Sequence, residues 1–267
     1  MQYWSKKVYL ATGNHDYMNV KAILLALLIC LPAHAELLTL CQESAEEDPF
    51  LTEFKLNDQS YYGQHSAISG HALQQLGIEF SIVRLPWRRC VSAAMNGQYD
   101  GVIGVGWDEE RGQKLLFPTL DNNLINEALR LYFVNYPIYT LATSALVWDG
   151  VKFENLKYGL TAPKGFIVEN KLKALGALQQ IEEGIDAGLS LLSGGRVDGV
   201  ILAEEVGNKV VATQKLQNIK RLDVLFYQQP IFLAITRSQK KITSAQIQAI
   251  WGQIPSSRLA MIGNADL

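Results

Sequence analysis

An arginine, Arg111, follows a glycine-rich apolar run and an acidic turn in the stretch GVGWDEER (104–111). A guanidinium is a planar, charged fork of N–H donors that matches the two oxygens of a carboxylate. Arg111 is therefore the strongest candidate in the chain for binding a carboxylate. The alternative is a surface arginine that pairs with Glu109 or Glu110 in the same turn.

The segment Lys164-Gly165-Phe166 is a second place for anion binding, because a helix is expected to begin there. Backbone N–H groups in the first turn of a helix attract negative charge, and the Lys164 ammonium adds to that attraction. An ordinary turn between a strand and a helix has the same kind of sequence, so a purely structural role stays open.

One carboxylate and two tryptophans are further candidates. Glu43 comes shortly after the first expected strand, at the edge where open α/β sheets bind ligands. A solvated acidic loop is the interpretation of Glu43 that we favour. Trp87 begins an expected helix and Trp107 lies in the arginine turn, so either indole could line a binding site or pack in the core.

Several other site chemistries are not indicated. His65 and His71 do not share a helical face, and no cysteine pair has zinc-ligand spacing. The sequence has no Gly-x-Ser-x-Gly, Walker or dinucleotide-binding motif. Its net charge of −2 does not indicate nucleic-acid binding. We expect no metal, no cofactor and no nucleic-acid partner.

A short motif occurs twice in the elements that must position these residues. GQYDGVI (97–103) returns as GRVDGVI (195–201), and each copy follows a short amphipathic helix. Two such helix–turn–strand units suggest two similar α/β lobes, which suits a chain of 267 residues with 48 % hydrophobic content. Chance recurrence is the alternative, because Gly-Asp turns before Val/Ile strands are common.

The order of expected elements also favours an α/β fold. The first part reads strand, helix, strand, helix, strand over 36–41, 64–76, 78–83, 87–96 and 100–105, which predicts a mostly parallel sheet with right-handed crossovers. Extended segments are expected at 128–135, 141–147, 157–161, 178–181, 197–202, 223–227 and 230–236. Further helices are expected at 166–175, 185–193, 203–212 and 243–254.

Residues 18–35 (MNVKAILLALLICLPAHA) have the pattern of a signal peptide, with a lysine, an apolar run and Ala33-His34-Ala35. The apolar run is shorter than the roughly 20 residues that span a bilayer. We expect translation to begin at Met18, cleavage after Ala35 and export to the periplasm. A buried N-terminal helix is the alternative.

The two cysteines that remain after residue 35 are Cys41 and Cys90. An even number of cysteines in an exported protein indicates a disulfide bond. Two buried thiols are the alternative.

The order of several motifs resembles that of extracytoplasmic solute-binding proteins, namely the two-lobed family 3 type, which includes the polar amino-acid receptors of ABC importers. The motifs are PWRRC (86–90) followed by a short helix and Gly-x-x-Asp-Gly, then DEER (108–111) and FP (117–118), then KYGLTAPKG (157–165) and GRVDG (195–199). The resemblance covers nearly all of residues 36–267.

This resemblance implies an α/β fold that is periplasmic-binding-protein-like (type II). Each lobe would be a mostly parallel sheet flanked by helices, and two crossing strands would join the lobes. Lobe 1 would comprise residues 36–125 and 229–267, and lobe 2 residues 126–228. The ligand would bind between the lobes and be enclosed by a hinge motion, as in periplasmic binding proteins generally.

The resemblance also implies roles for single residues. Arg111 would hold the ligand's carboxylate, and Trp87 would pack on the ligand's side chain. The receptors use an aspartate of the second lobe for the ligand's amino group, and Glu204 is the candidate substitute here. They also carry Ser or Thr hydroxyls where this chain has Gly104 and Gly106. A carboxylate or another small anion is therefore a safer expectation than an α-amino acid.

Three functions fit these features. The first is a binding protein, expected to be monomeric, that delivers a small polar solute to an ABC permease. The second is a periplasmic partner of a membrane sensor. The third is an enzyme resembling cyclohexadienyl (prephenate) dehydratases, with Glu43 or Glu204 as a general acid whose pKa is raised by burial. We favour the first and do not expect an enzyme.

Overall fold

The computed structural model describes residues 37–44, 53–56, 59–180 and 185–263. The expected signal peptide and its cleavage site lie outside these residues. None of the described helices is both long and apolar enough to cross a membrane.

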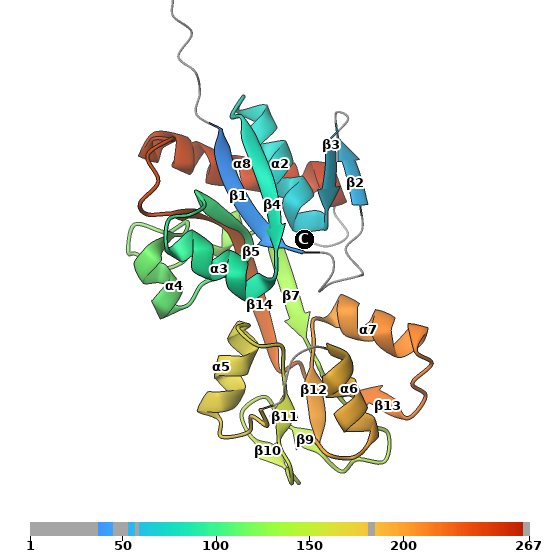
Figure 1. Ribbon diagram of the computed structural model, residues 1–267. Helices are drawn as coiled ribbons and strands as arrows, with labels where there is room; N and C mark the ends of the chain where they lie inside the picture. Colours follow the sequence, from blue (N-terminus) through green and yellow to red (C-terminus); the bar gives the residue numbers. More distant parts are fainter. Residues whose placement is uncertain (1–36, 45–52, 57–58, 181–184, 264–267) are drawn as a thin grey trace, which may run out of the picture. The chain divides into compact units, whose positions relative to one another are not determined.

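The larger of the two main sheets has the strand order β4-β1-β5-β14-β6, and β7 also pairs with β14 (Figure 1). Its strands are β1 (Leu38–Glu43), β4 (Phe80–Leu85), β5 (Gly101–Gly106), β6 (Leu115–Leu116), β7 (Tyr132–Tyr136) and β14 (Tyr227–Thr236). The same lobe contains the hairpin β2 (Glu53–Leu56) and β3 (Gln59–Tyr62), and the helices α2 (Gln64–Gln75), α3 (Trp87–Met95), α4 (Glu109–Lys114), α8 (Ser244–Ile262) and the short η1 (Glu127–Leu129).

The second sheet has the order β11-β12-β8-β13. Its strands are β8 (Ile138–Leu141), β11 (Leu160–Thr161), β12 (Gly199–Ile201) and β13 (Ile219–Arg221). Three helices and a short hairpin complete this lobe: α5 (Ile167–Ala174), α6 (Ile185–Ser193), α7 (Glu204–Thr213), β9 (Val147–Trp148) and β10 (Phe153–Glu154).

Two strands run side by side between the sheets (Figure 1). β7 leads into β8, and β14 returns, pairing with β7 antiparallel from Tyr227↔Tyr136 to Ile231↔Tyr132. Both sheets are mixed, where mostly parallel sheets were expected, because strands that enter or return from the other lobe pair antiparallel with their neighbours. The two-lobed α/β fold is confirmed, and the lobe boundaries stay a prediction.

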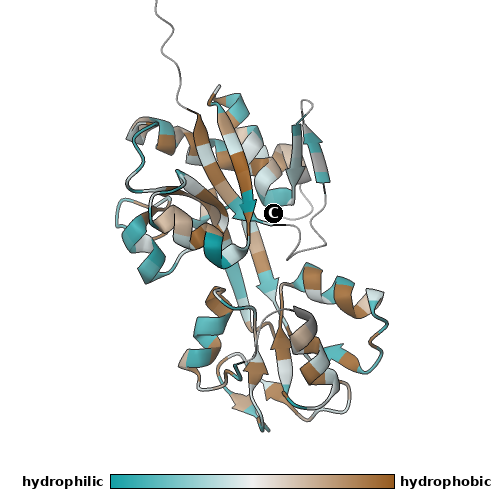
Figure 2. Cartoon of the chain, viewed as in Figure 1, coloured by the Kyte–Doolittle hydropathy of each residue, from teal (hydrophilic) through white to brown (hydrophobic). Residues whose placement is uncertain are grey.

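The larger sheet is buried on both faces. Alternate residues of β14 enter different cores: Leu233 and Ile235 pack in the core with α2 and α8, whereas Phe232 and Ala234 pack in the core with α3. Side chains on opposite faces of a strand alternate, so one strand serves both cores. Figure 2 shows the consequence: β1 and β4 are mainly hydrophobic, whereas α5 and α7 carry residues of both kinds.

The repeated motif ends a helix in the same way in both lobes. Gly97 follows α3 and Gly195 follows α6, each in the left-handed conformation, with φ of 78° and 64°. Glycine has no Cβ to clash in this conformation, so the motif requires it there.

The aspartate of the motif then ties its strand to the parallel neighbour. The Asp100 carboxylate accepts a hydrogen bond from the Thr39 N–H of β1, and the Asp198 carboxylate accepts three from the N–H groups of 157–159, which precede β11. Each lobe thus uses the same local module, which accounts for the sequence repeat.

Two elements extend beyond their expected bounds. β14 is one continuous strand over Tyr227–Thr236, where two segments, 223–227 and 230–236, were expected. At Pro230 the strand pairs only with β7, so the missing N–H leaves no partner unsatisfied on the other edge. α8 continues through Pro255 to Ile262, because contacts hold it on both sides: Trp251 bonds to the Leu233 carbonyl and Arg258 to the Arg130 carbonyl.

The segment expected to be extended at 141–147 is mostly a turn instead. β8 ends at Leu141, and β9 begins only at Val147. The Ser144 N–H bonds to the Leu141 carbonyl, and the Ser144 hydroxyl accepts from the Leu146 N–H. These local bonds replace strand pairing.

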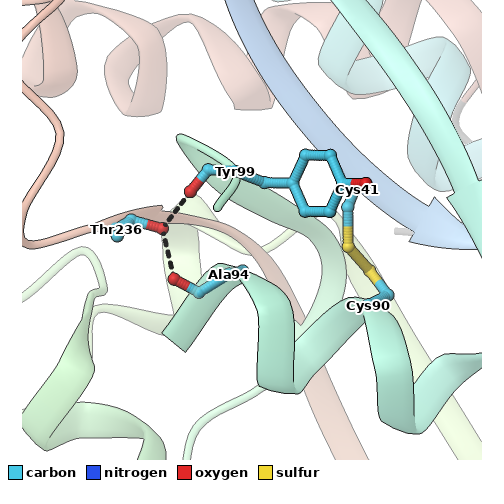
Figure 3. The surroundings of a disulfide bond; sticks show 5 residues. All are labelled: Cys41, Cys90, Ala94, Tyr99 and Thr236. Atoms are coloured by element: carbon cyan, nitrogen blue, oxygen red, sulfur yellow. Dashed lines mark hydrogen bonds between the residues drawn. A yellow bond between two sulfur atoms is a disulfide. The ribbon is translucent and has the colours of Figure 1, made fainter. Parts of the chain in front are cut away.

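The expected disulfide joins β1 to α3. Cys41 and Cys90 are fully buried, with their Cα atoms 5.7 Å apart (Figure 3). The Thr236 hydroxyl of β14 bonds to the carbonyl of Ala94, near the end of α3, and to that of Tyr99, in the turn that follows the helix. α3 is therefore attached to the sheet at both ends, and its first residue, Trp87, is held in place.

We predict that replacing both cysteines (Cys41→Ala/Cys90→Ala) lowers the free energy of unfolding by about 4 kcal/mol, because the bond closes a loop across 49 positions of the chain. Denaturant unfolding of residues 36–267 measures this. Reduced wild type is the control and should unfold at the same denaturant concentration as the variant. Equal stability of oxidised and reduced wild type would contradict the prediction.

Candidate functional site

Arg111 is buried in the first turn of α4, with only 6 % of its surface exposed. Asp108 caps this helix by accepting a hydrogen bond from the Arg111 N–H, 2.8 Å away, and its carboxylate lies 3.4 Å from the Arg111 Nε. The alternative, in which Arg111 lies on the surface and pairs with Glu109 or Glu110, is therefore wrong: Arg111 is buried, and it forms an ion pair with Asp108.

The Arg111 guanidinium bonds to backbone carbonyls of both lobes. Nη1 donates to the Gly106 carbonyl at 3.1 Å, and Nη2 donates to the Gly165 carbonyl at 2.8 Å. Each terminal nitrogen has two N–H groups, so each retains one beyond these bonds among the described residues. Burial lowers the pKa of Arg111 and the Asp108 carboxylate opposes this effect, so the group remains a cation. The guanidinium can therefore bind an anion.

The structure brings four of the predicted residues together: Trp87, Arg111, Gly165 and Phe166. The Trp87 indole donates to the Gly165 carbonyl at 3.3 Å, and its ring centroid lies 5.5 Å from that of Phe166. The Arg111 guanidinium carbon lies 5.9 Å from the Trp87 ring centroid. The carbonyl of Gly165 is thus shared by the indole and the guanidinium.

Gly165 has two reasons to be glycine. Its φ is 81°, and a Cβ at this position would lie 2.7 Å from the Cγ of Arg88 in α3. Its N–H donates to the Glu169 carboxylate at 2.6 Å, so Glu169 occupies one of the helix-start N–H groups that were expected to attract an anion. Lys164, directly before it, is partly buried.

The other predicted residues lie apart from this cluster or act differently. Trp107 is 46 % exposed and packs beside Gly112, where it lines a separate hollow on the surface. Glu204 forms an ion pair with Arg221 and accepts a hydrogen bond from the Asn135 amide at 3.0 Å. An amino group would have to compete with Arg221 for this carboxylate.

Glu43 is the last residue of β1, at the carboxyl end of the strand. Burial raises the pKa of the Tyr136 hydroxyl, the negative charge of Glu43 raises it further, and the positive charge of Arg111 lowers it. Glu43, Tyr136 and Arg111 are therefore within electrostatic reach of one another.

Sequence reasoning missed two residues of the crossing strands, Tyr136 and Gln229. Gln229 lies against Gly106: a Cβ on Gly106 would be 1.5 Å from the Gln229 amide nitrogen. Polar residues in otherwise apolar strands were the available signal. This signal could not identify the two residues unless it was known that both strands pass Arg111 and Trp87.

Gly104 and Gly106 stand where the resembling receptors carry Ser or Thr, and neighbouring side chains leave little room for a larger residue at either position. A Cβ on Gly104 would lie 3.3 Å from the His65 ring, and Gly104 has φ of 83°. The side-chain amide of Gln229 occupies the space that a side chain at Gly106 would need. Side chains from α2 and β14 thus occupy the space that a Ser or Thr would need.

His65 is held as a neutral imidazole. The Gln42 amide nitrogen donates to the Tyr62 carbonyl, which fixes the amide's orientation, and it lies 3.0 Å from His65 Nε2. That nitrogen must then accept, which leaves Nδ1 to donate to the Tyr132 hydroxyl at 3.3 Å. Burial lowers the pKa of His65 to about 4.

The described residues contain no group of three or more His, Cys, Asp and Glu side chains arranged to hold a metal ion.

No protein-family model and no curated protein sequence matches the chain. Solved structures do match. One is a histidine kinase sensor domain with similarity to periplasmic binding proteins, with a TM-score of 0.63, 17 % identity, and coverage of 85 % of this chain and 96 % of that one. The chain has the periplasmic-binding-protein fold.

Two further matching structures contain a bound amino acid. The GluR0 ligand-binding core in complex with L-glutamate has a TM-score of 0.61, 12 % identity, and coverage of 86 % of this chain and 93 % of that one. The amino acid ABC transporter substrate-binding protein AbpA from Streptococcus pneumoniae, bound to L-arginine, has a TM-score of 0.58, 16 % identity, and coverage of 84 % and 87 %. At these identities the likeness concerns the fold.

We predict a pH dependence of stability from His65 in this periplasmic-binding-protein fold. The unfolded chain binds a proton at the ordinary pKa of 6.5, whereas the folded chain does so only near 4. Between these values the unfolded state holds more protons, so stability falls as the pH decreases through this window.

In His65→Gln, thermal unfolding between pH 7 and pH 5 should shift less than in wild type. His71→Gln is the matched control, because it removes the other histidine of residues 36–267. Equal shifts in wild type and His65→Gln would show that His65 does not contribute.

Proposed function

We propose that the mature chain (36–267) is an extracytoplasmic solute-binding protein that captures a small carboxylate-bearing solute between its lobes. The observation that carries this proposal is the buried Arg111 guanidinium, whose two terminal nitrogens already bond to one carbonyl in each lobe. A buried cation with N–H groups still available is a ready acceptor for an anion.

Binding would couple to closure through the crossing strands. A carboxylate on Arg111 would gain charge-assisted hydrogen bonds, each of about 1.5–3 kcal/mol, in a site from which water is excluded. Trp87 and Phe166 come from different lobes and already face each other, so they can enclose the apolar part of a small solute. Because Arg111 and Trp87 already contact the other lobe, the hinge at β7 and β14 would open to admit the solute and close again over it.

The similar structures support this class of function. One is described as a transporter's substrate-binding protein bound to L-arginine, and another as a ligand-binding core with L-glutamate. We infer from this that the solute is amino-acid-like and that an ABC permease receives it. The protein would act as a monomer in the periplasm, where the Cys41–Cys90 disulfide is chemically stable.

A second candidate function is that of a periplasmic sensor partner. The observation in its favour is the similarity to a histidine kinase sensor domain, at a TM-score of 0.63. In this case the closed form would bind a membrane receptor instead of a permease. A dehydratase-like enzyme has less support, because Glu204, one of its two candidate acids, is engaged by Arg221 and Asn135.

We predict that a carboxylate-bearing compound stabilises the mature protein against heat, and that Arg111→Ala lowers its affinity at least about 30-fold, since truncating a buried charge partner typically costs 2–5 kcal/mol. A ligand at 1,000 times its dissociation constant adds about 4 kcal/mol of stability. Thermal unfolding against amino acids, carboxylates and small sugars measures both effects.

Two variants serve as controls. Arg111→Lys keeps the charge but loses the bidentate fork, so it should bind with intermediate affinity. Arg196→Ala removes an exposed arginine beyond α6 and should bind as wild type does. Arg111→Ala with wild-type affinity would refute the proposal.

A further inference from the structure

Two polar side chains on the crossing strands are buried without using their hydrogen-bonding groups. Tyr136 of β7 and Gln229 of β14 are each only 5 % exposed. Among the described residues, neither the Tyr136 hydroxyl nor the Gln229 amide has a hydrogen-bond partner. Neither group is among the fully buried, unbonded side-chain atoms of the described residues, so their polar atoms retain some exposed surface through which a ligand could bond to them.

Both side chains project from the same face of the crossing strands. Tyr136 pairs with Tyr227, and Gln229 pairs with Val134. Paired residues of an antiparallel ladder project to one side, and so do residues two positions apart along a strand. Tyr136 and Gln229 therefore share a face, one from each strand of the hinge.

That face meets the Arg111 cluster. The Gln229 amide lies against Gly106, whose carbonyl accepts the hydrogen bond from Arg111 Nη1. The Tyr136 hydroxyl is within electrostatic reach of both Arg111 and Glu43. Two neutral groups with unused bonds are thus placed beside the proposed carboxylate site.

Comparable buried residues elsewhere in the chain are bonded. The Tyr139 hydroxyl donates to the Asn208 side chain at 2.8 Å and also contacts the Glu204 carbonyl, and the Tyr61 hydroxyl donates to Gln59 at 2.9 Å. Gln42 is bonded on its amide nitrogen. Among the buried tyrosines and glutamines that the structure describes, the unbonded groups are therefore those of the hinge face; buried unbonded atoms of other residue types occur at Ser44, Arg84, Arg130 and Arg258.

We infer that Tyr136 and Gln229 are specificity-determining contacts, which hydrogen-bond a polar group of the solute whose carboxylate Arg111 holds. This inference rests on the proposed function. Both side chains are neutral donors and acceptors, and the negative charge of Glu43 acts on Tyr136. The favoured solute is a monocarboxylate that also carries a hydrogen-bond donor, and a second carboxylate is disfavoured.

The first test is stability without any ligand, using a matched pair of variants. Tyr136→Phe removes a hydroxyl that has no protein partner, so the melting temperature should stay the same or rise. Tyr139→Phe removes a bonded hydroxyl and should lower it by a few degrees. If Tyr136→Phe lowers the melting temperature as much as Tyr139→Phe, the Tyr136 hydroxyl serves the fold and the inference fails.

The second test is calorimetric binding of five probes: L-glutamine and L-arginine as donor-bearing monocarboxylates, propionate as one without a donor, and L-glutamate and succinate as dicarboxylates. Wild type should prefer the donor-bearing monocarboxylates. Tyr136→Phe and Gln229→Met should each weaken their binding about tenfold and leave propionate unaffected.

The outcomes separate the two proposals. If Arg111→Ala abolishes binding but both hinge variants bind all probes as wild type does, or if wild type prefers the dicarboxylates or propionate, the inference is overturned and the proposed function stands. If no probe binds wild type, or if Arg111→Ala binds as wild type does, the proposed function is overturned and the inference with it.

Discussion

A buried guanidinium sets the conditions that the rest of this molecule meets. A cation is buried only when acceptors surround it, and Arg111 has the Asp108 carboxylate and the carbonyls of Gly106 and Gly165. Asp108 is also the helix cap that fixes where α4 begins. Gly165 can approach only because it lacks a Cβ beside Arg88. One side chain thus links a helix start, a strand end and the other lobe.

The elements around Arg111 are fixed by strong, local constraints, whereas the connection between the lobes is slender. The disulfide and Thr236 hold α3, and the aspartates of the repeated motif hold one strand in each lobe. Between the lobes run β7 and β14, with Asn135 bonded to Gln228 across the pair. Under the proposed function, these two strands are where one lobe would move against the other.

Much of this could be predicted from the sequence wherever the signal was local. The helix–Gly–x–x–Asp–Gly–strand units, the cysteine pair and the Arg111 turn depend on neighbours in the chain. Tyr136 and Gln229 could not be found, because their importance comes from strands that pair across about 90 residues of sequence. Glu204 was assigned to the ligand, but β13 places Arg221 against it. Trp107 shares its turn with Arg111, yet it faces outward.

The most direct test of the central claim is a crystal structure of residues 36–267 with the compound that stabilises them most. The account predicts the ligand's carboxylate oxygens at about 2.7–2.9 Å from Arg111 Nη1 and Nη2, between the lobes. A ligand whose carboxylate lies elsewhere, with Arg111 bonded only to the carbonyls of Gly106 and Gly165, would contradict it.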